Sequence, residues 1–178
     1  MTDRPFPPQR PAAATAVAAA TAVVHAPGVR FTVLSPWLIR LEYSPAGQFE
    51  DRPSQVIWRR DLPVPEFTVD QTRDTLAIET AHLKLTYQTD ARAFTRRSLA
   101  IEVKATGAIW RYGDRGERDN LRGTARTLDS VDGATPLEPG LMSRAGWAVV
   151  DDSHSLVFDA RGWLTPRDRP GNLDLYFF

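Results

Sequence analysis

Hydrophobic and polar residues alternate along much of the chain between residues 29 and 112. A period of two places successive side chains on opposite faces of a β-strand, so each alternating segment is expected to bury one face. The alternating apolar positions are Val29, Phe31 and Val33; Ile39, Leu41 and Tyr43; Leu76 and Ile78; Leu83, Leu85 and Tyr87; and Leu99, Ile101 and Val103. The pattern predicts a strand at each segment, another at 109–112, and a hairpin joining the first two.

Further strands are predicted from local composition. Residues 55–60 carry three consecutive large apolar side chains, and the prolines that follow indicate a sheet edge or a crossing. Residues 147–150 and 155–158 are predicted to form a hairpin around a polar turn at 151–154. Roughly nine to eleven strands with no sustained helical period predict an all-β fold, a large antiparallel β-sandwich.

The first 23 residues differ in composition from the rest. They are rich in alanine and proline, which predicts a disordered leader followed by one β-sandwich domain over residues 24–178. The run from Ala12 to Ala26 is a weak match to a secretory signal because it lacks a leucine-rich apolar region. We therefore expect a cytoplasmic protein, with secretion as the alternative. No stretch has the roughly 20 apolar residues of a membrane span.

Charge and residue content exclude several classes of function. Lys plus Arg and Asp plus Glu are both 22, so there is no basic field for nucleic acid or an anionic membrane. The absence of cysteine excludes disulfides, thiolate catalysis and thiolate zinc sites. His25, His82 and His154 are scattered without metal-binding spacing, and Asp129 and Asp132 do not follow calcium-loop spacing. We predict no metal and no cofactor.

A dense group of charged and turn-forming residues lies between residues 126 and 153. Glycines such as Gly133 interrupt regular structure there, which predicts a displayed loop, the kind of segment that often carries function. Arg126, Asp129 and Asp132 are its candidate ligand-binding residues. The same pattern is explained equally well if the two aspartates are turn residues that face water and Arg126 is their partner on the surface.

Aromatic residues offer a second possible contact with a ligand. The tryptophans are Trp37, Trp58, Trp110, Trp147 and Trp163. An indole ring can stack on a sugar, but a large sandwich core also needs aromatic side chains, and we favour core packing for each of them. The final residues, LDLYFF, carry three consecutive aromatics without a polar tail and are expected to form a strand that meets a partner surface.

Four blocks resemble the amino-terminal region of bacterial glycoside hydrolase family 31 enzymes, which are retaining α-glucosidases and α-xylosidases. The blocks are VRFTVLSPWLIRLEYSPAGQFEDRPSQV (29–56), NLRGTARTLDSVDG (120–133), LEPGLMSRAGWAVVDDS (137–153) and DLYFF (174–178). The resemblance implies a galactose-mutarotase-like β-sandwich followed by a catalytic (β/α)8 barrel. In that family the barrel supplies both catalytic carboxylates, about 5 Å apart. No residue of this chain is therefore assigned a catalytic role.

The resemblance further implies that the domain packs on the barrel and lends a loop to the pocket for the α-glycoside substrate. Arg126, Asp129 and Asp132 are the loop candidates, because a carboxylate accepts charge-assisted hydrogen bonds from sugar hydroxyls. Arg122 and Ala145 depart from the family pattern, which weakens a ligand-binding role at Ala145.

Two rival functions remain open. The first is a free-standing carbohydrate-binding module. The second is a mutarotase-like enzyme, which is weaker because His82 and His154 lack a convincing acidic partner and a fold does not imply a function.

Overall fold

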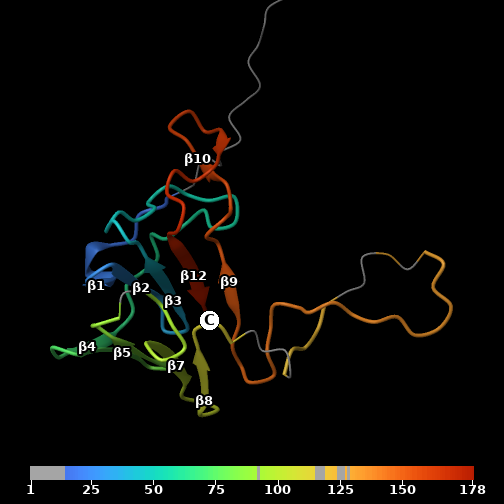
Figure 1. Cartoon of the computed structure of the whole chain (residues 1–178), viewed down its shortest axis with the longest axis horizontal. Helices are drawn as coiled ribbons and strands as arrows, with labels where there is room; N and C mark the ends of the chain where they lie inside the picture. The colour runs from blue at the N-terminus through green and yellow to red at the C-terminus, as the bar shows by residue number, and fades with distance from the viewer. Residues whose placement is uncertain (1–14, 92, 115–118, 124–126, 128) are drawn as a thin grey trace, which may run out of the picture. The chain divides into compact units, whose positions relative to one another are not determined.

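The computed structural model describes residues 15–178 apart from 92, 115–118, 124–126 and 128 (Figure 1). In this part of the chain the elements are twelve strands and one short 3-10 helix. The strands form two five-stranded sheets and one two-stranded sheet. The predicted all-β class of an antiparallel sandwich is confirmed. No helix among these residues is long and apolar enough to span a membrane.

The chain divides into two compact units. The first unit comprises residues 1–65 and 151–176, and the second comprises residues 66–150 and 177–178. The boundaries fall inside strands β9 and β12, so these two strands contribute residues to both units.

The first unit contains η1 (Ala20–Ala22), β1 (Val23–Ala26), β2 (Val29–Ser35), β3 (Leu38–Tyr43), β10 (Val157–Phe158) and β11 (Leu164–Thr165). Its main sheet has the order β1-β2-β3-β12-β9, in which β12 is Leu173–Phe177 and β9 is Val149–Asp151. The predicted hairpin is confirmed, because β2 and β3 pair antiparallel from Val29↔Tyr43 to Val33↔Ile39. The predicted apolar face is buried, with Val29, Phe31, Val33, Ile39 and Leu41 fully inaccessible.

The second unit contains a five-stranded antiparallel meander. Its strands are β4 (Phe67–Gln71), β5 (Thr75–Thr80), β6 (Leu83–Gln88), β7 (Leu99–Val103) and β8 (Ala108–Arg111), in that spatial order. The strands predicted from alternation in this region are confirmed, and their inward residues are buried. Strand β4 was not predicted; its alternation is limited to Phe67 and Val69, and its edge position leaves four of its five residues exposed.

The strand predicted at residues 55–60 is wrong. Ser54 Oγ accepts hydrogen bonds from the backbone N–H groups of Val56 and Ile57, at 3.2 and 2.8 Å, which bends the chain into a turn. Val56 and Trp58 are consequently exposed. A short apolar run does not make a strand when a serine side chain satisfies the backbone locally.

Residues 1–14 of the predicted leader lie outside the described part of the chain, and the residues after them have regular contacts. Residues 15–22 include η1, the backbone N–H of Arg60 donates to the carbonyl of Thr15 at 2.8 Å, and Ala22 is buried. Strand β1 follows at once and pairs with β2. The alanine-rich composition alone did not indicate these contacts.

The hairpin predicted over 147–158 is also wrong. Strand β9 lies next to β12, and β10 pairs with β11 through Val157↔Thr165 and Phe158↔Leu164. The predicted polar turn contains Asp152, which is fully buried, and its backbone N–H donates to the carbonyl of Asp174 at 2.8 Å. Asp152 therefore forms a contact inside the protein and does not belong to a solvent-facing turn.

The expectations for the aromatic residues are corrected as well. Tyr176 and Phe177 are 1% and 0% exposed, so most of the terminal aromatic run is covered within this chain. In the second unit the Phe177 ring lies 5.3 Å from that of Trp110. The core-packing prediction holds for Trp110 and is wrong for the exposed tryptophans, which are Trp37, Trp58 and Trp163.

Candidate functional site

The predicted binding loop lies in the second unit. Asp129 and Asp132 are exposed there, and neither carboxylate forms a hydrogen bond or an ion pair with another described residue. Arg126 lies outside the described residues. The role of these three residues in ligand binding therefore stays a prediction.

The base of this loop is nonetheless well fixed. Asn120 Oδ1 accepts from the backbone N–H groups of Arg122 and Gly140 at 2.7 Å each, while Asn120 Nδ2 donates to the Gly140 carbonyl at 2.7 Å. A Cβ at Gly140 would lie 2.5 Å from the Arg122 carbonyl oxygen, so this close approach requires glycine. The Leu121 N–H also donates to the Met142 carbonyl at 3.0 Å. These bonds form the stem of the loop.

Large apolar side chains on the stem and the loop remain exposed. They are Leu121, Val131, Leu137, Leu141 and Met142, of which Met142 is the most exposed at 58%. Figure 1 shows the segment as a long orange excursion without regular strands. A contiguous patch of exposed apolar side chains is typical of a surface that binds a partner, whereas scattered ones are ordinary on a protein surface.

A second cluster of charged residues lies in the first unit and is buried. On the face of the sheet opposite its apolar core, β3 carries Arg40 and Glu42, and β12 carries Asp174. Arg40 Nε and Nη2 donate to the two oxygens of Asp174 at 2.7 Å each, and both residues are at most 3% exposed. This geometry is the two-pronged pairing that guanidinium and carboxylate groups favour.

Glu42 lies between two arginines. Its carboxylate accepts from Arg30 Nε at 2.6 Å and from Arg30 Nη2 at 2.8 Å, and it lies 3.0 Å from Arg40 Nη2. Burial raises the pKa of Glu42, and the charges and hydrogen bonds of Arg40 and Arg30 oppose that shift. Burial would also raise the pKa of Asp174, but Arg40 and Arg167 hold it below its usual value.

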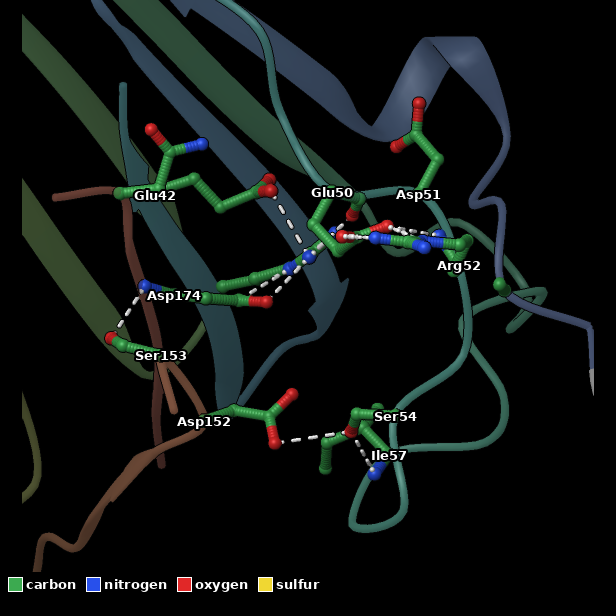
Figure 2. Close-up of polar contacts among 12 residues, drawn as sticks. Glu42, Glu50, Asp51, Arg52, Ser54, Ile57, Asp152, Ser153 and Asp174 are labelled. Atoms are coloured by element: carbon green, nitrogen blue, oxygen red, sulfur yellow. Dashed lines mark hydrogen bonds and ion pairs between the residues drawn. The ribbon is translucent and has the colours of Figure 1, made fainter. Parts of the chain in front are cut away.

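Arg167 joins a third carboxylate to the cluster. It donates to Asp174 Oδ2 at 3.0 Å and to Asp152 Oδ2 at 2.8 Å. Figure 2 shows Asp152 turned toward Ser54, whose hydroxyl donates to Asp152 Oδ1 at 3.0 Å, and Ser153 beside Asp174. Burial raises the pKa of Asp152, and the hydroxyl bonds and the Arg167 charge only partly offset the shift.

The segment from residue 48 to residue 60 covers this polar face. The Glu50 carbonyl accepts from Arg40 Nη2 at 2.8 Å, and the Glu50 carboxylate binds Arg52, which holds its pKa below the usual value despite burial. Arg60 donates from Nε to the Tyr176 hydroxyl at 2.7 Å and is 1% exposed. We call these residues the buried charge network: Arg30, Arg40, Glu42, Glu50, Arg52, Arg60, Asp152, Arg167, Asp174 and Tyr176.

The buried charge network is suited to holding the first unit together and unsuited to acid–base chemistry. Glu42, Asp152 and Asp174 are each at most 3% exposed, and each is bound by an arginine, so a substrate cannot reach them. A catalytic acid or base must lie within hydrogen-bond reach of its substrate. Among the described residues, no group of three or more acidic or histidine side chains could hold a metal ion.

Sequence reasoning missed the buried charge network, although two signals point to it. Arg40 and Glu42 occupy alternate positions on β3. Arg30 on β2 lies directly opposite Glu42. Asp174 is the single charged residue in the otherwise apolar run LDLYFF. A carboxylate within such an apolar run indicates a buried charge, which requires a cationic partner from another strand.

The first unit also has a surface cavity of about 270 Å³. Its polar lining includes His154, Arg167, Arg169 and Asn172, and neither Asp129 nor Asp132 contributes to it. Arg169 and Asn172 already bind Gln48 through its side chain and its carbonyl.

No model of a known protein family matches this chain, and a search of curated proteins finds no match either.

Proposed function

We propose that this chain is a non-catalytic accessory domain of a family 31 retaining α-glycosidase, which packs on a catalytic (β/α)8 barrel and lends a loop to its sugar pocket. The observation that carries the proposal is the loop of the second unit. Its stem is fixed by the Asn120 and Gly140 contacts, while apolar side chains such as Leu141 and Met142 stay exposed. We expect the surface of a partner to cover these apolar side chains.

The state of the carboxylates supports a role without catalysis. The buried acids of the first unit are bound by arginines, and Asp129 and Asp132 stand on an exposed loop without a described partner. A retaining glycosidase needs two carboxyl groups about 5 Å apart on either side of the glycosidic bond. On the barrel's rim, Asp129 or Asp132 would instead accept hydrogen bonds from sugar hydroxyls.

An activity assay tests the catalytic half of the proposal. The purified chain, incubated with aryl α-glucosides and aryl α-xylosides, should release no phenol above the background rate. Turnover that co-purifies with the chain through several columns would overturn the assignment of a non-catalytic domain.

A binding assay tests the accessory half. We expect the chain to co-elute with the barrel of a bacterial family 31 enzyme whose own amino-terminal domain has been removed. Leu141→Asp combined with Met142→Asp should abolish co-elution, because the two charges would be buried in the contact. Leu62→Asp is the matched control, since Leu62 is also exposed, at 37%, but lies outside the loop. Equal loss in both variants would contradict a role for the loop.

The alternative of a free-standing carbohydrate-binding module is favoured by the exposed indoles. Trp37, Trp58 and Trp163 are 47%, 47% and 36% exposed, so their rings are accessible to the apolar face of a sugar. Calorimetric titration with maltose and with xylose-containing oligosaccharides separates the two functions. Saturable heat from the chain alone supports the module, and its absence supports the accessory domain.

A further inference from the structure

Strand β4 of the second unit is an edge strand with an open outer side. It pairs with β5 in five consecutive positions, from Phe67↔Thr80 to Gln71↔Leu76, without a bulge. In the described part of the chain no other strand pairs with it. It is also the longest edge strand of the two large sheets there, with five residues against three or four in β1, β8 and β9. The open side of a regular edge strand is a template for pairing with another chain.

The alternation of hydrogen bonds along β4 determines which backbone groups point outward. The Thr72 N–H donates to the Thr75 carbonyl at 2.8 Å, and these two residues directly continue the β4–β5 register. Because hydrogen-bonded and non-bonded pairs alternate in an antiparallel ladder, the backbone groups of Thr68 and Asp70 also point toward β5. The residues whose N–H and carbonyl groups point away from β5 are therefore Phe67, Val69 and Gln71.

The apolar side chains of β4 lie on the core face of the sheet. Phe67 and Val69 are directly opposite Thr80 and Ile78, both of which are buried. Val69 is nevertheless 44% exposed, whereas Ile78 beside it is fully inaccessible. The apolar face of the sheet thus reaches its edge and is left partly uncovered there. A strand added on the open side of β4 would cover Val69 and bond to the outward-pointing backbone groups.

We propose that β4 pairs antiparallel with β4 of a second copy of this chain, about a twofold axis at Val69. The axis places Val69 opposite Val69 of the second copy, and Phe67 opposite Gln71 in both directions. All of these residues have outward-pointing backbone groups, and each hydrogen-bonded pair exchanges two bonds, so the contact gains about six backbone hydrogen bonds. It involves no residue of the loop over 129–146 and does not depend on the proposed function.

The charge of Asp70 selects this register. With the axis at Val69, Asp70 lies opposite Thr68 of the second copy, whose hydroxyl is a donor for the carboxylate. An axis at Asp70 would instead place two carboxylates directly opposite each other, which is unfavourable. An axis at Thr68 would place Gln71 opposite Pro65, which has no N–H to donate. The strand is therefore complementary to itself in the register centred on Val69.

Sedimentation velocity measures the dimer itself. The unaltered chain should show a monomer–dimer equilibrium that depends on its concentration. Val69→Lys sets two positive charges opposite each other and should leave only monomers. Ile109→Lys is the matched control, since Ile109 is 53% exposed on β8, the other edge of the same sheet, and this variant should dimerise like the unaltered chain. Dimers that persist in Val69→Lys, or an unaltered chain that stays monomeric, overturn the proposal.

A single introduced cysteine tests the register, because the chain has none of its own. The two Cα atoms of a hydrogen-bonded antiparallel pair lie about 5.5 Å apart, a distance that a disulfide spans. On mild oxidation at equal protein concentration, Val69→Cys should form a disulfide-linked dimer much faster than Ile109→Cys, as measured on non-reducing gels. Equal rates in the two variants overturn the proposed register.

Amide hydrogen exchange of the unaltered chain decides should the variants fail to fold. Exchange rates are measured by NMR at low and at high protein concentration. The amides of Phe67, Val69 and Gln71 should exchange about tenfold more slowly when nine tenths of the chains are dimeric, because only the monomer exposes them. The amides of Thr68 and Asp70, which already bond to β5, should change far less. Slowing that is equal at all five positions, or absent, overturns the proposal.

Discussion

The two regions richest in charge show opposite relations between sequence and environment. The stretch over residues 126–153 looked like a functional site in the sequence, and its Asp129 and Asp132, in the second unit, face solvent without described partners. The polar face of β2, β3 and β12 in the first unit looked like an ordinary solvent-facing strand pattern. Yet Arg40 and Glu42 are 2% and 1% exposed. Density of charge along a chain therefore says little about where charge has structural consequences.

The physical difference lies in how each charge is compensated. An exposed carboxylate keeps its hydration and needs no partner, so its removal alters the folded state little. A carboxylate that has lost its water depends on hydrogen-bonded cations, as Asp174 depends on Arg40 and Arg167. Substitutions of equal chemistry should thus have unequal effects in the two regions.

The largest effect is expected from Asp174→Asn. This variant leaves Arg40 with a weakened buried partner, and breaking a buried ion pair costs about 3–5 kcal/mol in the free energy of unfolding. Asp168→Asn is the matched control, since the Asp168 side chain is 70% exposed on Arg52 and should cost at most about 1 kcal/mol. Urea unfolding measures both. Equal losses in the two variants would show that burial does not determine how much an ion pair contributes to the free energy of unfolding.

A smaller loss is expected from Tyr176→Phe. The Tyr176 hydroxyl accepts from Arg60 Nε at 2.7 Å, so its removal leaves a buried donor of that guanidinium unsatisfied. The expected cost is about 1–3 kcal/mol in the free energy of unfolding, because the ring itself stays in place. A change below about 0.5 kcal/mol would mean that Arg60 readily finds another acceptor.

The raised pKa of Asp152 should affect how the free energy of unfolding depends on pH. Its folded-state pKa is raised, so the folded protein binds more protons than the unfolded chain between the two pKa values. The stability that Asp152 contributes is therefore present at low pH and is lost as the pH rises through its folded-state pKa. Asp174 has the opposite sign, because its lowered pKa makes its contribution disappear as the pH falls below the unfolded value of about 3.9.

Asp152→Asn isolates the first of these contributions. Relative to the unaltered protein, the variant should lose most stability near pH 4 and progressively less as the pH rises toward 7. The pH-dependent part of this loss amounts to about 1.4 kcal/mol for each unit by which burial raises the pKa of Asp152. Urea unfolding at several pH values measures it, and a difference that is independent of pH would contradict the raised pKa.

The sequence predicted the strands whose apolar residues alternate, because burial of one sheet face imposes the period directly. It did not predict β4, whose edge position removes the constraint, or the turn at residues 54–57, which a single serine hydroxyl creates. Alternation also cannot tell whether the polar face of a strand meets water or another segment. Arg40 was placed correctly on the polar face, but its burial depends on residues 48–60, and strand periodicity does not encode that contact.

The smallest effect is expected in the loop. Asp129→Asn combined with Asp132→Asn should change the free energy of unfolding by no more than about 0.5 kcal/mol, because both carboxylates are exposed and form no described contact. The same double variant should weaken sugar binding if the loop reaches a pocket on a catalytic barrel, since each lost carboxylate removes a charge-assisted acceptor. Urea unfolding of the chain alone and the KM of its complex with a barrel measure the two effects. An unchanged stability with a raised KM would assign the loop to the ligand, whereas a marked loss of stability would show that its acids, like those of the buried charge network, hold the fold.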